Sequence, residues 1–83
     1  MKNKSFGRFI SADPRVCHGK LCFRGTRILV TDVLELVAQG MNWDEIIKEC
    51  HGSVSRRAIA EAIRLAGRVI VEQHERRERL ASV

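Results

Sequence analysis

GMNWDEIIKECHGSVSRRAIAEAIRLAGR, residues 40–68, reads as a short helix, a tight turn and a longer helix. Asn42 is a favourable N-cap residue, and Glu45, three positions later, completes a capping box. Gly52, inside the break after the first helix, is placed to adopt a left-handed conformation, and Ser55 is placed to cap the second helix. The first helix has a one-sided apolar pattern, made by Trp43, Ile46, Ile47 and Cys50.

The second helix has an apolar stripe and a charged face. The stripe consists of Ile59, Ala62, Ile63, Ala66, Val69 and Ile70. The charged residues recur at intervals of four, three and four, and are Arg57, Glu61, Arg64 and Arg68. Two helices, a short turn and arginines on the second helix are typical of helix-turn-helix recognition of DNA. The alternative is a helical hairpin that only builds a core, with a solvated arginine face.

Charge is unevenly distributed along this chain of 83 residues, which is long enough for one domain. The net charge is +5 and 45% of the residues are hydrophobic, as in a globular protein. Residues 1–30 are basic, residues 31–55 are acidic, and the chain from Arg56 onward is basic again. This segregation favours a polyanion on some faces and a basic protein on another, whereas solubility explains only the total charge.

The sequence lacks the motifs of membrane proteins, exported proteins and common enzyme classes. No apolar run approaches the roughly 20 residues of a membrane span, and the start MKNKSFGRFI has no apolar signal region, so we expect a cytoplasmic protein. No paired carboxylates, nucleophile elbow or phosphate loop is recognisable, so we do not expect an enzyme.

The three cysteines, Cys17, Cys22 and Cys50, are expected to be reduced thiols. Cys17 and Cys50 each precede a histidine, which makes a zinc site chemically conceivable. The spacing matches no standard zinc finger, and Cys50 lies on an apolar stripe. We therefore expect neither a metal nor a cofactor.

Residues 1–30 are predicted to form a β-rich arm. Extended segments are expected at residues 6–11, 21–23 and 27–30, separated by turns at Asp13-Pro14, His18–Lys20 and Arg24–Thr26. Such an arm is too thin to form a sheet alone, so it must pack on the helices or pair with a second copy of the chain. We expect a homodimer built through this arm.

Three helices are predicted to follow as a body over residues 31–72. The first helix is expected to begin with Thr31 as its cap and to end at Gly40. After Ile70 the charged sequence predicts a helical extension that frays into a tail, residues 73–83. The predicted fold class is therefore mainly α, a helix-turn-helix body preceded by a short β-rich arm.

Four short motifs together resemble family 433 of the domains of unknown function. They are Asp13-Pro14, Gly19-Lys20-Leu21, Arg24-Gly25-Thr26-Arg27 and Gly40-Met41. Leu21 and Leu29 stand where the family usually has proline, which loosens the predicted turns of the arm without removing a charge. The resemblance covers about Phe9 to Ala66, most of the chain.

The resemblance implies a homeodomain-like three-helix fold preceded by small strands. It also implies an antitoxin of a type II toxin–antitoxin pair, similar to VapB-type antitoxins, whose usual partner is a PIN-like ribonuclease toxin. Such a protein would also bind its own operator DNA and repress transcription. The alternative is a protein-interaction module, or a DNA-binding regulator without a toxin partner.

Two groups of residues are predicted to carry these functions. The group expected to contact DNA comprises Ser55, Arg56, Arg57, Arg64 and Arg68. The group expected to contact a protein partner comprises Arg24, Arg27, Arg76, Arg77 and Arg79. For Arg24 and Arg27 an equal alternative is a structural turn whose arginines satisfy backbone carbonyls.

Overall fold

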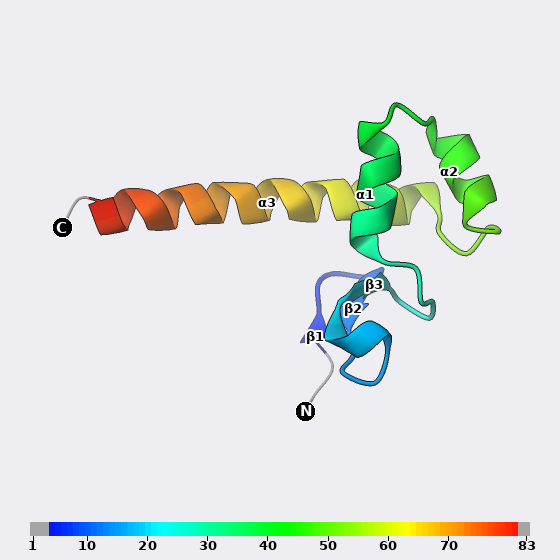
Figure 1. Cartoon of the computed structure of the whole chain (residues 1–83), viewed down its shortest axis with the longest axis horizontal. Coiled ribbons are helices and arrows are strands. Elements are labelled where there is room, and N and C mark those ends of the chain that lie inside the picture. The colour runs from blue at the N-terminus through cyan, green and yellow to red at the C-terminus, as the bar shows by residue number, and fades with distance from the viewer. Residues whose placement is uncertain (1–3, 82–83) are drawn as a thin grey trace.

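The computed structural model describes residues 4–81. A small sheet comes first, made of β1 (Lys4–Ser5), β2 (Ile10–Ala12) and β3 (Leu21–Phe23), with a 3-10 turn, η1 (Cys17–Gly19), before β3. Three helices follow: α1 (Val30–Ala38), α2 (Trp43–Glu49) and α3 (Arg56–Ala81). Figure 1 shows α1 crossing the first half of α3, the sheet below them, and α2 beside the start of α3. The protein is thus mainly helical, with three helices and a short antiparallel N-terminal sheet.

The sheet is an antiparallel meander in the order β1-β2-β3. Ile10 pairs with Phe23, and Ser5 pairs with Ser11. The strand expected over residues 6–11 is wrong in its first half, because residues 6–9 form the turn between β1 and β2. Gly7 has φ +98°, which reverses the chain there and which few other residues tolerate.

The three turns predicted for the arm are present. Val16 N–H donates to the Asp13 carbonyl (2.9 Å), η1 occupies the second turn, and Thr26 N–H donates to the Phe23 carbonyl (3.0 Å). The expected extended run of residues 21–23 is strand β3. Only one bridge, between Cys22 and Leu29, is formed within the last predicted extended segment.

The start of α1 lies two residues before the predicted start. The helix begins at Val30 with Leu29 as N-cap, and that cap makes no side-chain hydrogen bond. Thr31 therefore lies inside the first turn instead of capping it. Burial decides this boundary, because Val30 is 3% exposed and packs into the core from the first helical position.

The core joins the sheet to all three helices. Ile10 and Phe23 come from the sheet, and the arm therefore packs on the helices, as expected. The buried cluster comprises Ile10, Phe23, Val30, Val33, Ile46, Cys50, Val54, Ala58, Ile59, Ala62 and Leu65. Cys50 is buried there as a small hydrophobic residue, as its position on the α2 stripe predicted.

Helix α3 has a packed first half and an exposed second half. Its buried stripe includes Ile59 and Ala62, as predicted, and also Leu65, which the predicted stripe omitted. Ile63, by contrast, is 37% exposed, and every residue from Gly67 to Leu80 is exposed. In Figure 1 this second half projects beyond the rest of the molecule.

The predicted fraying near residue 72 is not observed, since α3 continues to Ala81. Oppositely charged residues recur four positions apart in this half, for example Glu72 with Arg76 and Glu75 with Arg79. His74 and Glu78, also four apart, approach to 3.9 Å. Good helix formers and such pairs support a helix even where nothing packs against it. Within residues 4–81 no helix is both long and apolar enough to cross a membrane.

Candidate nucleic-acid interface

The helices α2 and α3, on either side of the turn, each begin with a side-chain cap. Asn42 Oδ1 accepts the Glu45 N–H at the start of α2, and Asn42 Nδ2 donates to Glu45 Oε1, both at 2.9 Å. Ser55 Oγ accepts the Ala58 N–H (3.1 Å) at the start of α3. All three hydrogen bonds follow from local sequence, and the capping predictions for Asn42 and Ser55 are confirmed.

The turn itself is held by two left-handed residues and one buried side chain. His51 and Gly52 have φ +53° and +75°, and the Gly52 N–H donates to the Ile47 carbonyl (2.9 Å). Val54 is 1% exposed, so the turn is anchored in the core. The direction in which α3 leaves α2 is therefore set before any ligand is present.

The first half of α3 turns a basic face to solvent. The core side of the helix is occupied by Ala58, Ile59, Ala62 and Leu65. Arg57, Arg64 and Arg68 lie on the other side and are exposed. Glu61 and two small residues, Ala60 and Gly67, lie between them, and the small residues let a ligand approach the helix backbone closely.

A hollow of about 430 Å³ lies where this face meets the β1–β2 loop. It is lined by Arg8, Phe9, Arg56, Arg57, Ala60, Glu61 and Arg64. A second, more open hollow of about 370 Å³ shares Arg64 and continues along α3 past Gly67 to Glu75. The basic stretch ends there, because Glu72 and Glu75 line the far side of the second hollow.

Arg56 is partly occupied by α2. Its Nη2 lies 2.6 Å from Asp44 Oδ1, and its guanidinium lies 6.0 Å from the centre of the Trp43 ring. Both charged side chains are more than half exposed, so the pair contributes little to stability. The pairing orients Arg56 toward α2, so its guanidinium is engaged by a carboxylate, whereas no ion pair within residues 4–81 engages Arg57 or Arg64.

The sequence places Glu61 on the charged face of α3, and in the structure its carboxylate binds the N-terminal arm. Its Oε1 accepts the Phe9 N–H at 3.1 Å, across 52 residues of sequence. The Phe9 ring lies 5.8 Å from the guanidinium of Arg57 and 5.8 Å from that of Arg8. The sequence pattern predicted an extended segment for Arg8 and Phe9 and did not assign them to a binding site. Gly7, directly before Arg8, is the local sequence signal that indicates a turn here.

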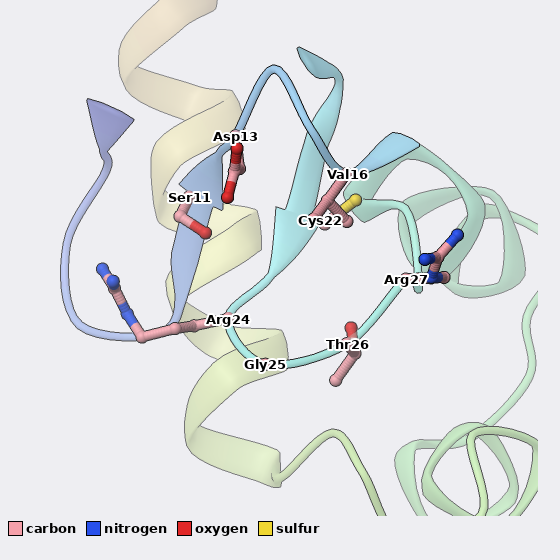
Figure 2. A pocket seen from close by; sticks show the side chains of 8 residues that line it. All are labelled: Ser11, Asp13, Val16, Cys22, Arg24, Gly25, Thr26 and Arg27. Atoms are coloured by element: carbon pink, nitrogen blue, oxygen red, sulfur yellow. The ribbon is translucent and has the colours of Figure 1, made fainter. Parts of the chain in front are cut away.

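Arg24 and Arg27 flank a separate hollow in the arm, of about 390 Å³ (Figure 2). Arg24 Nε donates to the Arg8 carbonyl (3.1 Å) and Nη2 to the Gly7 carbonyl (3.4 Å). Arg24 thus satisfies backbone carbonyls, the structural alternative considered for it. Figure 2 shows Arg27 pointing away from Arg24, so the two guanidinium groups do not converge on one anion.

The remaining predicted partner residues, Arg76, Arg77 and Arg79, are exposed on the projecting half of α3. Exposed apolar side chains share this half, and Ile70 and Leu80 are 68% and 71% exposed. The predicted site residues therefore lie in three separate places. These are the turn after β3, the first half of α3 and the projecting second half of α3.

The cysteines form no part of the basic face. All three are free thiols. Burial, together with a hydrogen bond between its thiol and that of Cys17, raises the pKa of the Cys22 thiol to about 11. Burial also raises the pKa of Cys50. Across residues 4–81, histidine, cysteine and carboxylate side chains form no group of three that could hold a metal ion.

Comparison with protein families finds one matching family. The family described as "Protein of unknown function (DUF433)" matches residues 10–66, more than half of the chain. The chain belongs to the DUF433 family. The resemblance carried by the four sequence motifs is confirmed at this level. The DUF433 match ends at Ala66, where α3 leaves the body, so the projecting half of the helix lies outside it. Searches of curated proteins and of solved structures find no match.

Proposed function

We propose that this DUF433 protein is a DNA-binding autorepressor and the antitoxin of a type II toxin–antitoxin pair, acting in the cytoplasm. In this proposal α2 and α3 form a homeodomain-like helix-turn-helix, and a PIN-like ribonuclease is the toxin. The observation that carries the DNA-binding part is the exposed row Arg57, Arg64 and Arg68 beside Arg8, on a helix whose direction is fixed by a capped turn.

The arginine row suits a nucleic acid because no ion pair within residues 4–81 engages its members. Guanidinium groups bind phosphates and guanine edges in two-pronged geometry. Ser55 lies at the start of α3, where backbone N–H groups favour a phosphate. The small residues Ala60 and Gly67 leave room for a groove edge.

Binding to a labelled duplex from the region upstream of the gene tests this part. Arg57→Ala and Arg64→Ala should each cost about 1–3 kcal/mol if they contact bases, and less if they contact only phosphates. Arg15→Ala is the control, because Arg15 is exposed, pairs with Asp13 (3.2 Å) and lies outside the row. If the variant that carries both substitutions binds the duplex as tightly as the wild type, the DNA-binding surface lies elsewhere, and Arg24 and Arg27 are the next residues to test.

The antitoxin part is supported by the family resemblance and by the projecting half of α3. A PIN-like ribonuclease holds its metal with clustered carboxylates, which repel one another unless a cation is near. An arginine from Arg76, Arg77 or Arg79 would neutralise such a cluster and compete with the metal. The exposed Ile70 and Leu80 give the same segment apolar contacts to offer.

Co-expression with the product of the adjacent gene, followed by a pull-down and a nuclease assay, tests the pairing. We expect one stable complex in which RNA cleavage is suppressed. An adjacent gene that encodes no nuclease, with no complex formed, would contradict the antitoxin assignment.

A protein-interaction module without a DNA role is the second candidate. It is favoured by the exposed apolar residues of α3, since Ile70 and Val71 are 68% and 54% exposed. Complex formation with a partner, combined with no binding of the upstream duplex at low salt, would decide for this function.

A further inference from the structure

We propose that the β1–β2 loop is a second wall of the DNA-binding surface, with Arg8 as a phosphate contact and Glu61 as the residue that positions it. The inference rests on the proposed DNA binding and extends it to a part of the chain that precedes the helices. Its ligand is the phosphate backbone of duplex DNA beside the groove that α3 enters.

The first argument is the convergence of positive charge. Arg8 from the loop and Arg57 and Arg64 from α3 line the same hollow. The one carboxylate in its lining, Glu61, accepts the Phe9 N–H (3.1 Å). Together with Arg56, which pairs with Asp44, four arginines from two elements line the hollow. They make a concentrated positive region, which attracts a polyanion before any specific contact forms.

The second argument is that Phe9 arranges two of these cations. Its ring centre lies 5.8 Å from the guanidinium carbon of Arg8 and 5.8 Å from that of Arg57. A guanidinium over an aromatic face keeps its N–H donors free at the edges, where a phosphate can receive them. Both side chains are therefore partly ordered before binding, which lowers the entropy lost when a complex forms.

The third argument is that the loop is tied to α3 at one point. The Phe9 N–H donates to Glu61, and the Phe6 N–H donates to the Ile10 carbonyl (2.9 Å), which closes the loop. Gly7 approaches Glu61 so closely that a Cβ at Gly7 would collide with its carboxylate. Glu61 therefore links the loop to α3, and Gly7 leaves the room that its carboxylate occupies.

Arg8→Ala tests the contact, measured by fluorescence anisotropy on the upstream duplex and on an unrelated duplex of equal length. We expect binding to weaken about 3- to 10-fold on both duplexes, and the slope of log K against log salt to decrease by about 1, because a phosphate contact carries no sequence information. Arg15→Ala, at the other end of the sheet, should change neither quantity.

Glu61 is tested by two variants of equal charge. Glu61→Gln retains an oxygen that accepts the Phe9 N–H, and it should bind DNA as tightly as the wild type or more tightly, because a negative charge is removed. Glu61→Ala loses the acceptor, and it should bind about 3-fold or more weaker despite the same charge change. A purely electrostatic role would make both variants bind equally tightly.

Three outcomes decide the inference, with folding of each variant checked by circular dichroism. The inference is supported if Arg8→Ala weakens DNA binding as expected and Glu61→Ala binds DNA more weakly than Glu61→Gln. Unchanged affinity and salt slope in Arg8→Ala, with a clear loss in Arg57→Ala, would overturn the inference and leave the DNA-binding proposal intact. Absence of wild-type binding to either duplex at low salt would overturn both.

Discussion

Phe23 is one of two buried sheet residues, with Ile10, that join the sheet to the helices. Its side chain is 2% exposed, and its backbone N–H donates to the Ile28 carbonyl (3.0 Å). Phe23→Ala should lower the free energy of unfolding by about 3–5 kcal/mol, because it removes a large buried side chain and leaves a cavity. Urea unfolding followed by circular dichroism measures this. Leu80→Ala, on an exposed position, should change the value by less than about 0.5 kcal/mol. A similar small effect at Phe23 would contradict a close-packed junction.

The Cys22 thiol should make the protein less stable in alkali. Its pKa is about 11 in the folded chain, against an ordinary value of 9.0. Between these values the unfolded chain releases a proton that the folded chain retains, so stability is complete below pH 9 and falls as the pH rises toward 11. The raised pKa of Cys50 acts in the same direction.

Urea midpoints measured from about pH 8 to about pH 11 test this linkage. Cys22→Ala should reduce the alkaline loss of stability, and Cys50→Ala should reduce it as well. An identical decline in both variants and in the wild type would assign the loss to other groups.

Residues whose role is local could be predicted from the sequence, and residues whose role is distant could not. Asn42 and Ser55 cap helices through bonds to N–H groups three residues away, and a cap motif states this directly. Glu61 was predicted to lie on the charged face of α3. Its hydrogen bond to Phe9 spans 52 residues and depends on how the arm packs, which no periodicity contains. Arg8 was missed for the same reason.

At the scale of elements, the start of α3 combines a structural role with a proposed binding role. Ser55→Ala should cost about 1 kcal/mol of stability, because the Ala58 N–H loses its acceptor. Ser55→Asp keeps an acceptor and should retain stability, yet it should weaken DNA binding by adding a negative charge near the proposed phosphate position. Thermal melts and anisotropy separate the two effects. Ser53→Ala, at an exposed position in the turn, is the control, and an equal loss of stability there would contradict a specific cap.

The projecting half of α3 should be dispensable for folding. A chain ended after Glu72 should unfold at nearly the same urea concentration as the full chain, because residues 73–80 are exposed and contribute nothing to the buried cluster. It should also bind DNA with unchanged affinity, since the arginine row ends at Arg68. The same truncation should abolish inhibition of the nuclease partner. Full inhibition at equal stoichiometry would show that another surface blocks the nuclease.

Helix α3 continues to Ala81, beyond the predicted end of the three-helix body at residue 72, because a helix can be stable without packing against a core. Its apolar stripe does lose contact with the core near Val69, which is 44% exposed. The charged sequence that follows was expected to fray. Its glutamates and arginines instead alternate at the spacing that supports a helix in water, and glycine and proline are absent from residues 68–81.

At the scale of the whole molecule, strand β1 offers an edge to a second copy of the chain. It is the outer strand of the sheet and pairs with β2 on its other side. We expect a dimer by light scattering at micromolar concentration, and a monomer when residues 1–5 are deleted. Ile70→Ser should remain dimeric. The reverse pattern would place the dimer contact on α3, and a monomeric wild type would contradict dimerisation altogether.

Because α3 is one continuous helix, the side chains of its second half point in directions that are fixed relative to those of its first half. Each residue of a helix advances about 1.5 Å and turns about 100°, so the segment from Gly67 to Ala81 is a rod of about 22 Å whose faces are registered to the arginine row. One residue inserted after Val69, beyond the last arginine of the row, would leave the composition of both surfaces nearly unchanged and would turn one about 100° relative to the other. In the proposed function, DNA held by the arginine row and a nuclease held by the distal half would then face different directions. Binding of both at once would constrain the length of the segment between the two surfaces, even where the identity of each side chain is free to vary.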